Sequence, residues 1–221
     1  MTDQILSSAA KATAALHETR PFVARPVIDR VGLSGGTQPQ LGTHRTAVAS
    51  YLYIQREAGA DRIGELPKAY LAKRPDLVDR GRVYPRHTSP SLREGRMLWD
   101  EADSASLRHD LAEASASHIV ASLPLSMTSP EWRELVTKWA LETLVAQGMI
   151  VDWCVHALID PGTGRWAVKP HLHALATARD FKPGLRRGRR QYAWLKSARQ
   201  VQAVEDSWLR LSGLQPSLIA A

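Results

Sequence analysis

Residues 149–178 read MIVDWCVHALIDPGTGRWAVKPHLHALATA, and this stretch decides the fold. Two largely apolar runs, 149–159 and 170–178, alternate in the manner of β-strands. Between them lies the turn-rich segment Asp-Pro-Gly-Thr-Gly at 160–164. The stretch therefore predicts two antiparallel strands joined as a hairpin.

The alternation also predicts what each face of this hairpin carries. Side chains two positions apart on a strand share a face, so the apolar set can pack against helices while the intervening residues face the other way. The apolar set is Val151, Trp153, Val155, Leu172, Ala174 and Ala176. The opposite face then carries His156, His171 and His173, and we expect no helix above them.

Three converging imidazoles can form a facial metal site with positions left for a substrate oxygen, which suits a metal that polarises a phosphate. The alternative is a cluster of surface histidines that binds metal adventitiously and has no function. Cys154 lies on the same face and could be a fourth ligand, although a small buried thiol is the commoner role.

Outward from the hairpin, helical spacing and end signals predict several helices. Residues 61–96 are rich in proline, arginine and glycine, and we expect little regular structure there. The expected helices are 2–19, 43–60, 93–116, 129–148 (capped by Ser129) and 191–211; the other expected strands are 26–33 and 118–124. This order predicts an α+β fold, an antiparallel β-sheet with helices packed on one face.

Positive charge is concentrated just after the hairpin. The chain of 221 residues has a net charge of +7, and residues 179–199 hold eight basic residues against Asp180 alone. The candidates for binding a polyanion such as nucleic acid are Arg179, Lys182, Arg186, Arg187, Arg189 and Arg190. A solvated, arginine-rich surface without a partner is the alternative.

Other features limit the class of protein. No segment reads as a transmembrane span, and the first twenty residues lack the apolar core of an export signal. Cys154 is the only cysteine, which excludes an internal disulfide framework and fits a reducing compartment. We therefore expect a cytoplasmic protein without a membrane partner.

The helix expected from Thr43 carries Tyr51 and Tyr53, which stand about 200° apart around its axis. Only one of them can face a given site. A tyrosyl oxygen can attack phosphorus and form a phosphotyrosine that preserves the energy of the broken phosphodiester. The residues alone do not select this role over two packing aromatics.

Four motifs, in order along the chain, resemble the MobA/MobL family of plasmid mobilisation relaxases. They are Thr46–Glu57 (TAVASYLYIQRE) with Ser34-Gly35-Gly36 before it, Leu98–Asp103 (LWDEAD), Leu123-Pro124 followed by Ser129-Pro130-Glu131, and His156 with Lys169–His173 (KPHLH). The resemblance covers about residues 27–212. It implies an HUH relaxase-like two-layer sandwich in residues 27–213, with residues 1–26 as an N-terminal extension and 214–221 as a tail.

Carried over residue by residue, the resemblance assigns the nucleophile to Tyr53 and the metal ligands to His156, His171 and His173. It implies Mn²⁺ or Mg²⁺ as the cofactor, with other transition metals compatible with imidazole ligands. The implied reaction is the nicking of single-stranded DNA at a transfer origin in a bacterial cell, which leaves the 5′-phosphate on Tyr53. Origin duplex DNA, accessory mobilisation proteins and the type IV coupling machinery are the implied partners.

The sequence departs from the family pattern at two positions. His118 stands where the family commonly has a glutamate, so it is a candidate base or ligand; Lys169 replaces an asparagine. Two alternatives to a working relaxase remain. One is a catalytically impaired, relaxase-derived DNA-binding module, and the other is a metal-dependent phosphodiesterase that uses water.

Overall fold

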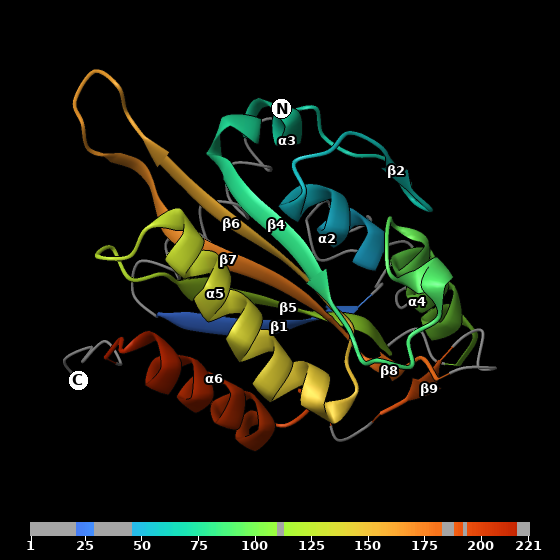
Figure 1. Cartoon of the computed structure of the whole chain (residues 1–221). Helices are drawn as coiled ribbons and strands as arrows, with labels where there is room; N and C mark the ends of the chain where they lie inside the picture. The colour runs from blue at the N-terminus through green and yellow to red at the C-terminus, as the bar shows by residue number, and fades with distance from the viewer. Residues whose placement is uncertain (1–20, 29–45, 110–112, 183–187, 192–193, 216–221) are drawn as a thin grey trace.

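The computed structural model describes residues 21–28, 46–109, 113–182, 188–191 and 194–215. Its centre is a five-stranded sheet in the order β1-β5-β7-β6-β4, in which every neighbouring pair is antiparallel (Figure 1). The strands are β1 (Phe22–Ile28), β4 (Leu77–Val83), β5 (Ala114–Ser122), β6 (Val151–Ile159) and β7 (Trp166–Thr177). The predicted hairpin is thus confirmed as β6 and β7, and it forms the middle of the sheet.

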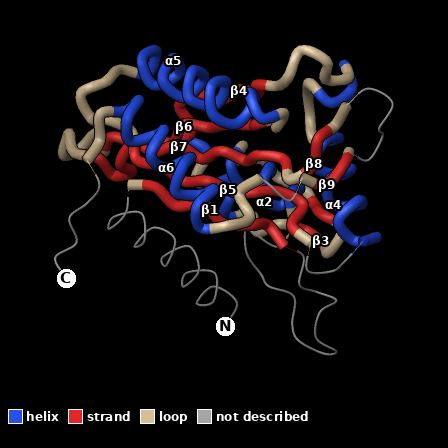
Figure 2. The backbone as a smooth tube through the Cα atoms, turned by 90° about the horizontal axis from the view of Figure 1, so that it is seen from below, coloured by secondary structure: helices blue, strands red, loops and turns tan. Residues whose placement is uncertain are grey.

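Helices lie on both faces of this sheet (Figure 2). The main ones are α2 (Ala47–Ile54), α4 (Met97–His109), α5 (Ser129–Trp139) and α6 (Ala198–Ser212). The shorter elements are α3 (Ala69–Ala72), three 3₁₀ turns at Arg74–Asp76, Pro90–Leu92 and Val145–Gln147, a π turn at Ala140–Leu144, and the two-residue strands β2 (Ala60–Asp61), β3 (Gly64–Glu65), β8 (Arg179–Asp180) and β9 (Arg189–Arg190). The α+β class with an antiparallel sheet is confirmed.

The first core lies between the sheet and the helices α5 and α6. It contains the apolar side chains predicted for one face of the hairpin, which are Val151, Trp153, Val155, Leu172, Ala174 and Ala176. Trp139 of α5 meets Trp208 of α6 edge to face, with ring centroids 5.2 Å apart, and both rings are fully buried. This core holds the hairpin flat against two helices and leaves its histidine face turned away from them.

The second core lies on the histidine face, where the sequence predicted no helix. Helices α2 and α4 pack there around Trp99, Cys154 and Leu175. Helices therefore cover both faces of the sheet, and the expectation that they cover one face is corrected. The small residues Ala47 and Ala49 allow α2 to lie close to the sheet.

Strand β4 is a second correction, since residues 61–96 were expected to have little regular structure. It pairs with β6 at the sheet edge although its sequence, LVDRGRV, is mostly polar. Two of its charged residues form ion pairs with other elements. Arg82 pairs with the buried Asp152 of β6, and Asp79 pairs with Arg133 of α5. These long-range ion pairs replace the apolar alternation that marks an ordinary strand.

Several predicted boundaries shift. Thr128, not Ser129, caps α5 and forms a capping box with Glu131, and the helical segment ends at Gly148, whose φ is 109°. Helix α6 begins at Ala198 instead of 191, and β5 begins at 114 instead of 118. The first strand is β1, displaced toward the N-terminus from 26–33, while the expected helix 2–19 and the loop 34–36 lie outside the described residues.

Candidate functional site

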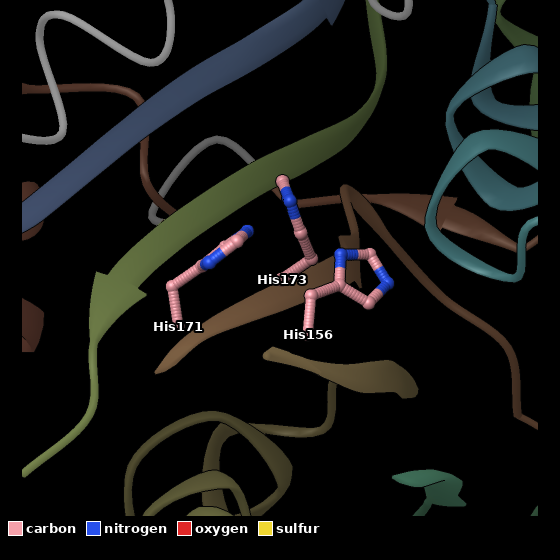
Figure 3. Close-up of side chains that lie close together, drawn as sticks. All are labelled: His156, His171 and His173. Carbon is pink, nitrogen blue, oxygen red and sulfur yellow. The ribbon is translucent and has the colours of Figure 1, made fainter. Parts of the chain in front are cut away.

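Three histidines meet on the sheet face that α2 covers. His156 of β6 is directly opposite His171 of β7, and His173 is opposite Cys154, so strand pairing places all three imidazoles on one face. One ring nitrogen from each residue lies within 4.8 Å of the others (Figure 3). Ring centroids are 4.8 to 5.5 Å apart. The convergence expected from strand phase is therefore present.

Each of the three rings has a partner for its other nitrogen. His171 Nδ1 donates to the carbonyl oxygen of Lys169 at 2.8 Å, and His156 Nε2 donates to that of Ile54 at 2.8 Å. His173 Nδ1 lies 2.9 Å from Nε2 of His118. Such contacts fix the tautomer and orientation of metal-ligating histidines, since the nitrogen that keeps its lone pair is the one that can bind a cation. The three residues thus fit the donor set of a metal site.

A positive charge is strongly disfavoured on two of these rings, those of His156 and His173. Burial lowers the pKa of His156 and of His173 well below the usual value, and neighbouring cations add to the effect. Both rings are therefore neutral near pH 7, which is the form that coordinates a metal. Cys154 is fully buried and burial raises the pKa of its thiol, so it remains a protonated core residue outside the histidine cluster.

Tyr53, from the last turn of α2, stands beside the histidine cluster. Its ring centroid is 5.5 Å from that of His173 and 6.4 Å from that of His118. The ring is half-buried, with Tyr70 edge-on at 5.0 Å and the ammonium of Lys73 5.8 Å from its centroid. Of the two tyrosines predicted to diverge around this helix, Tyr53 is the one with ring contacts to the histidines.

Tyr51 has a different environment. Burial, followed by the nearby charge of Asp152, raises the pKa of Tyr51 to about 12. Its hydroxyl is thus harder to ionise than an ordinary tyrosine, and its electrostatic neighbours are Asp152, Glu57, Arg82 and Arg80.

Helix α2 is anchored at its N-terminus by α4 and by its own cap. Asp103 of α4 accepts hydrogen bonds from the backbone amides of Ala47 and Val48, at 2.8 and 3.0 Å. Thr46 caps the helix by accepting from the amide of Ala49, and its hydroxyl donates to Asp61. Two of the amides that every helix leaves unpaired at this end are therefore bound by a carboxylate that lies far along the chain.

The C-terminal end of α2 is held by a buried ion pair that the sequence did not reveal. Arg56 makes a bidentate pair with Asp76, at 2.8 and 2.9 Å, and their side chains are only 2% and 7% exposed. The same guanidinium donates to the carbonyl oxygen of Tyr53 at 3.0 Å and contacts Nδ1 of His156 at 2.9 Å. Arg56 belongs to one of the quoted motifs, but nothing in the spacing of Asp76 pointed to it as a partner.

His118 is buried at the edge of the cluster, with its Nε2 directed at His173. Among the described contacts it touches the other histidines through His173 and lies farther than His173 from the ring of Tyr53. Its Nε2 lies 2.9 Å from Nδ1 of His173, a contact that can orient the His173 ring.

The basic residues after the hairpin are not equivalent. Arg179 is buried and paired with Glu113, and Arg190 donates to the carbonyl oxygen of Ala114 while also lying near Glu113. Burial withdraws the guanidinium of Arg179 from the surface, contrary to its expected contact with DNA. Lys182 and Arg189 are exposed, and Arg186 and Arg187 lie outside the described residues.

Comparisons with known proteins agree with this architecture. The model of the MobA/MobL family matches residues 45–208. A structure solved in work on the molecular basis of vancomycin resistance transfer in Staphylococcus aureus is similar in fold, with a TM-score of 0.63, 19% sequence identity, and coverage of 88% of this chain and 90% of that one. No curated protein matches the sequence significantly. Within the described residues, no helix combines the length and apolar character needed to cross a membrane.

Proposed function

The chain belongs to the MobA/MobL family of plasmid mobilisation relaxases, and from this premise we propose that it nicks one DNA strand at a transfer origin through a covalent link to Tyr53. The observation that carries the proposal is the contact between the ring of Tyr53 and that of His173, at 5.5 Å between centroids. A phosphate bound at the histidine cluster would lie beside the ring of Tyr53.

In this proposal His156, His171 and His173 hold a divalent cation, Mn²⁺ or Mg²⁺, as expected from the family. When bound, the ion offsets the negative charge that develops on the phosphate as the transition state forms. The neutral imidazoles of His156 and His173 and the outer partners of all three rings support this assignment. We assign His118 to the orientation of His173 and not to proton transfer.

The chemical step is an in-line displacement at phosphorus. The Tyr53 oxygen forms a bond to phosphorus while the bond from phosphorus to the 3′ oxygen breaks. The tyrosyl proton is lost to solvent and the leaving 3′ oxygen gains one, so a free 3′-hydroxyl and a 5′-phosphotyrosine result. Because the link preserves the energy of the phosphodiester, the same hydroxyl or another one can reverse the step.

DNA is held in this proposal by the exposed basic residues near β8 and β9. Lys182 and Arg189 are accessible for phosphate contacts, and Arg186 and Arg187 lie between them in the sequence. Single-stranded DNA and the adjoining duplex of the origin are the expected ligands. The accessory mobilisation proteins and the coupling machinery that a relaxase needs for transfer are part of the same proposal.

The test is incubation with single-stranded oligonucleotides and Mn²⁺, followed by denaturing electrophoresis to detect a covalent protein–DNA adduct. We expect an adduct with the wild-type protein and with Tyr51→Phe, and none with Tyr53→Phe. Cleavage without an adduct would indicate that water is the nucleophile. DNA binding without cleavage would indicate a binding module that has lost its chemistry.

A further inference from the structure

We propose that Arg56, held in place by Asp76, competes with the cation for Nδ1 of His156 and so sets a low affinity of this protein for its metal. This inference rests on the proposed metal site, and it concerns a residue that neither the motifs nor the family resemblance assigns. It makes Arg56 a residue that tunes the affinity of the metal site.

The hydrogen bonds of His156 determine which of its nitrogens has the lone pair. Nε2 lies 2.8 Å from the carbonyl oxygen of Ile54, which can only accept, so Nε2 carries the hydrogen. Nδ1 is contacted by a group that can only donate, so Nδ1 must have the lone pair. That group is Nη2 of Arg56, at 2.9 Å. A guanidinium and a metal ion therefore require the same lone pair.

Arg56 cannot withdraw easily from this contact. Its guanidinium is almost completely buried and is bound through two nitrogens to Asp76, a geometry that is stronger and more directional than a single hydrogen bond. A third nitrogen donates to the carbonyl oxygen of Tyr53. Arg56 also has a φ of 55°, in the left-handed region, so the chain turns sharply here to aim the side chain inward.

The charge of Arg56 acts in the same direction as its hydrogen bond. An arginine remains protonated under all ordinary conditions, so a fixed positive charge lies within hydrogen-bond distance of a proposed ligand atom. A divalent cation at the three histidines is repelled by that charge, and Asp76, whose carboxylate is bound to the guanidinium, offsets part of the repulsion. The hydrogen-bond partner of His171 is the carbonyl oxygen of Lys169, and that of His173 is the ring of His118.

Metal titration by isothermal calorimetry, with Mn²⁺ alone and no DNA, tests the inference. The main variant is Arg56→Met/Asp76→Asn, which removes the donor and the charge at Nδ1 but leaves the net charge of the protein unchanged. Replacing both members of a buried ion pair avoids leaving a lone carboxylate in the interior. We expect the dissociation constant for Mn²⁺ to fall by about tenfold, the scale on which outer partners of metal-ligating histidines act.

Two further variants make the result specific. Arg56→Gln/Asp76→Asn also removes both charges but keeps a neutral donor near Nδ1, and we expect it to tighten Mn²⁺ binding as well. Arg80→Gln removes an equal charge from the neighbouring strand, where Arg80 pairs with Glu57 and lies opposite Cys154, and we expect no change. Thermal unfolding of each variant checks that it is folded.

A double-mutant cycle separates competition at Nδ1 from a general effect. In a His156→Ala background, the substitution of Arg56 and Asp76 should tighten the remaining Mn²⁺ binding by less than it does in the wild-type background, because only the charge repulsion is left to relieve. Unchanged or weaker binding in Arg56→Met/Asp76→Asn would overturn the inference. If His171→Ala leaves Mn²⁺ binding intact in the wild-type background, the proposed metal site itself is wrong, which is a distinguishable result.

Discussion

Asp103 accepts a hydrogen bond from the backbone amide of Ala47 at 2.8 Å, although the two residues lie 56 positions apart in the sequence. The contact fixes the start of α2 relative to α4, and through α2 it fixes Tyr53 relative to the histidines. The carboxylate is buried, and burial raises its pKa to about 6 from a usual value of 3.8.

This shift predicts how stability depends on pH. Between about pH 4 and pH 6 the folded protein retains a proton on Asp103 that the unfolded chain has lost, so this group makes the protein less stable as pH rises through that range. Asp103→Asn removes the titration. Urea unfolding at pH 4.0 to 7.5 should show wild type losing stability relative to the variant up to about pH 6, with no further change above it. A difference that is constant over the whole range would contradict the assignment.

Substitution of one histidine of the cluster should abolish both metal binding and the DNA-nicking reaction. His171→Ala removes one of three converging nitrogens, so we expect loss of both bound Mn²⁺ and the covalent DNA adduct. Equilibrium dialysis followed by elemental analysis measures the metal, and denaturing electrophoresis measures the adduct. His87→Ala is the matched control, because His87 is exposed and outside the cluster. Retention of metal and adduct by His171→Ala would refute the site.

The exposed basic residues predict a change in the salt dependence of DNA binding. If Lys182 and Arg189 each contact one phosphate of a single strand, Lys182→Gln/Arg189→Gln should reduce the slope of log affinity against log salt by about 1.4. Fluorescence anisotropy with a labelled oligonucleotide, in the absence of metal, measures it. Arg199→Gln/Arg210→Gln removes the same charge from exposed positions on α6, on the other face of the sheet, and should leave the slope nearly unchanged. Equal slopes in the two variants would show that β8 and β9 are not the binding surface.

Gly81 of β4 lies so close to the side chain of Trp153 that a larger residue should destabilise the fold. A Cβ atom at this position would lie 2.7 Å from Cζ2 of Trp153, a buried aromatic of the first core, so the strand or the ring must move. We expect Gly81→Ala to lower the free energy of unfolding by about 1–3 kcal/mol, the usual cost of overpacking. Gly162→Ala in the hairpin turn, where the nearest contact is the side chain of Asp160, should cost much less. Chemical denaturation compares the two variants, and equal stabilities would argue against this packing.

Features encoded by neighbouring residues could be predicted from the sequence. The strands β6 and β7 follow from alternation over 149–178, and the convergence of His156 with His171 and His173 follows from strand phase alone. The start of α5 was predicted to within one residue because proline and the cap residues act locally. These signals need no knowledge of the rest of the chain.

Features that depend on distant partners could not be predicted. Strand β4 is polar, and its ion pairs from Arg82 to Asp152 and from Asp79 to Arg133 show why it joins the sheet. Counting charges placed Arg179 on a DNA-binding surface, but its pairing with Glu113 buries it. The pair of Arg56 with Asp76 joins two segments that share no periodicity. In each case a charge is neutralised by a residue whose proximity only the fold reveals.

The histidine cluster and Tyr53 differ in how far apart along the chain the residues that position them lie. All three histidines belong to one hairpin, so their convergence needs only a local turn and the pairing of adjacent strands. Tyr53 is held beside them by contacts of its neighbours that span 56 positions, from Ala47 to Asp103, and 20 positions, from Arg56 to Asp76. Local pairings form early during folding and long-range ones later. The histidines should therefore come together before the tyrosine arrives, which makes docking of α2 the step that completes the site.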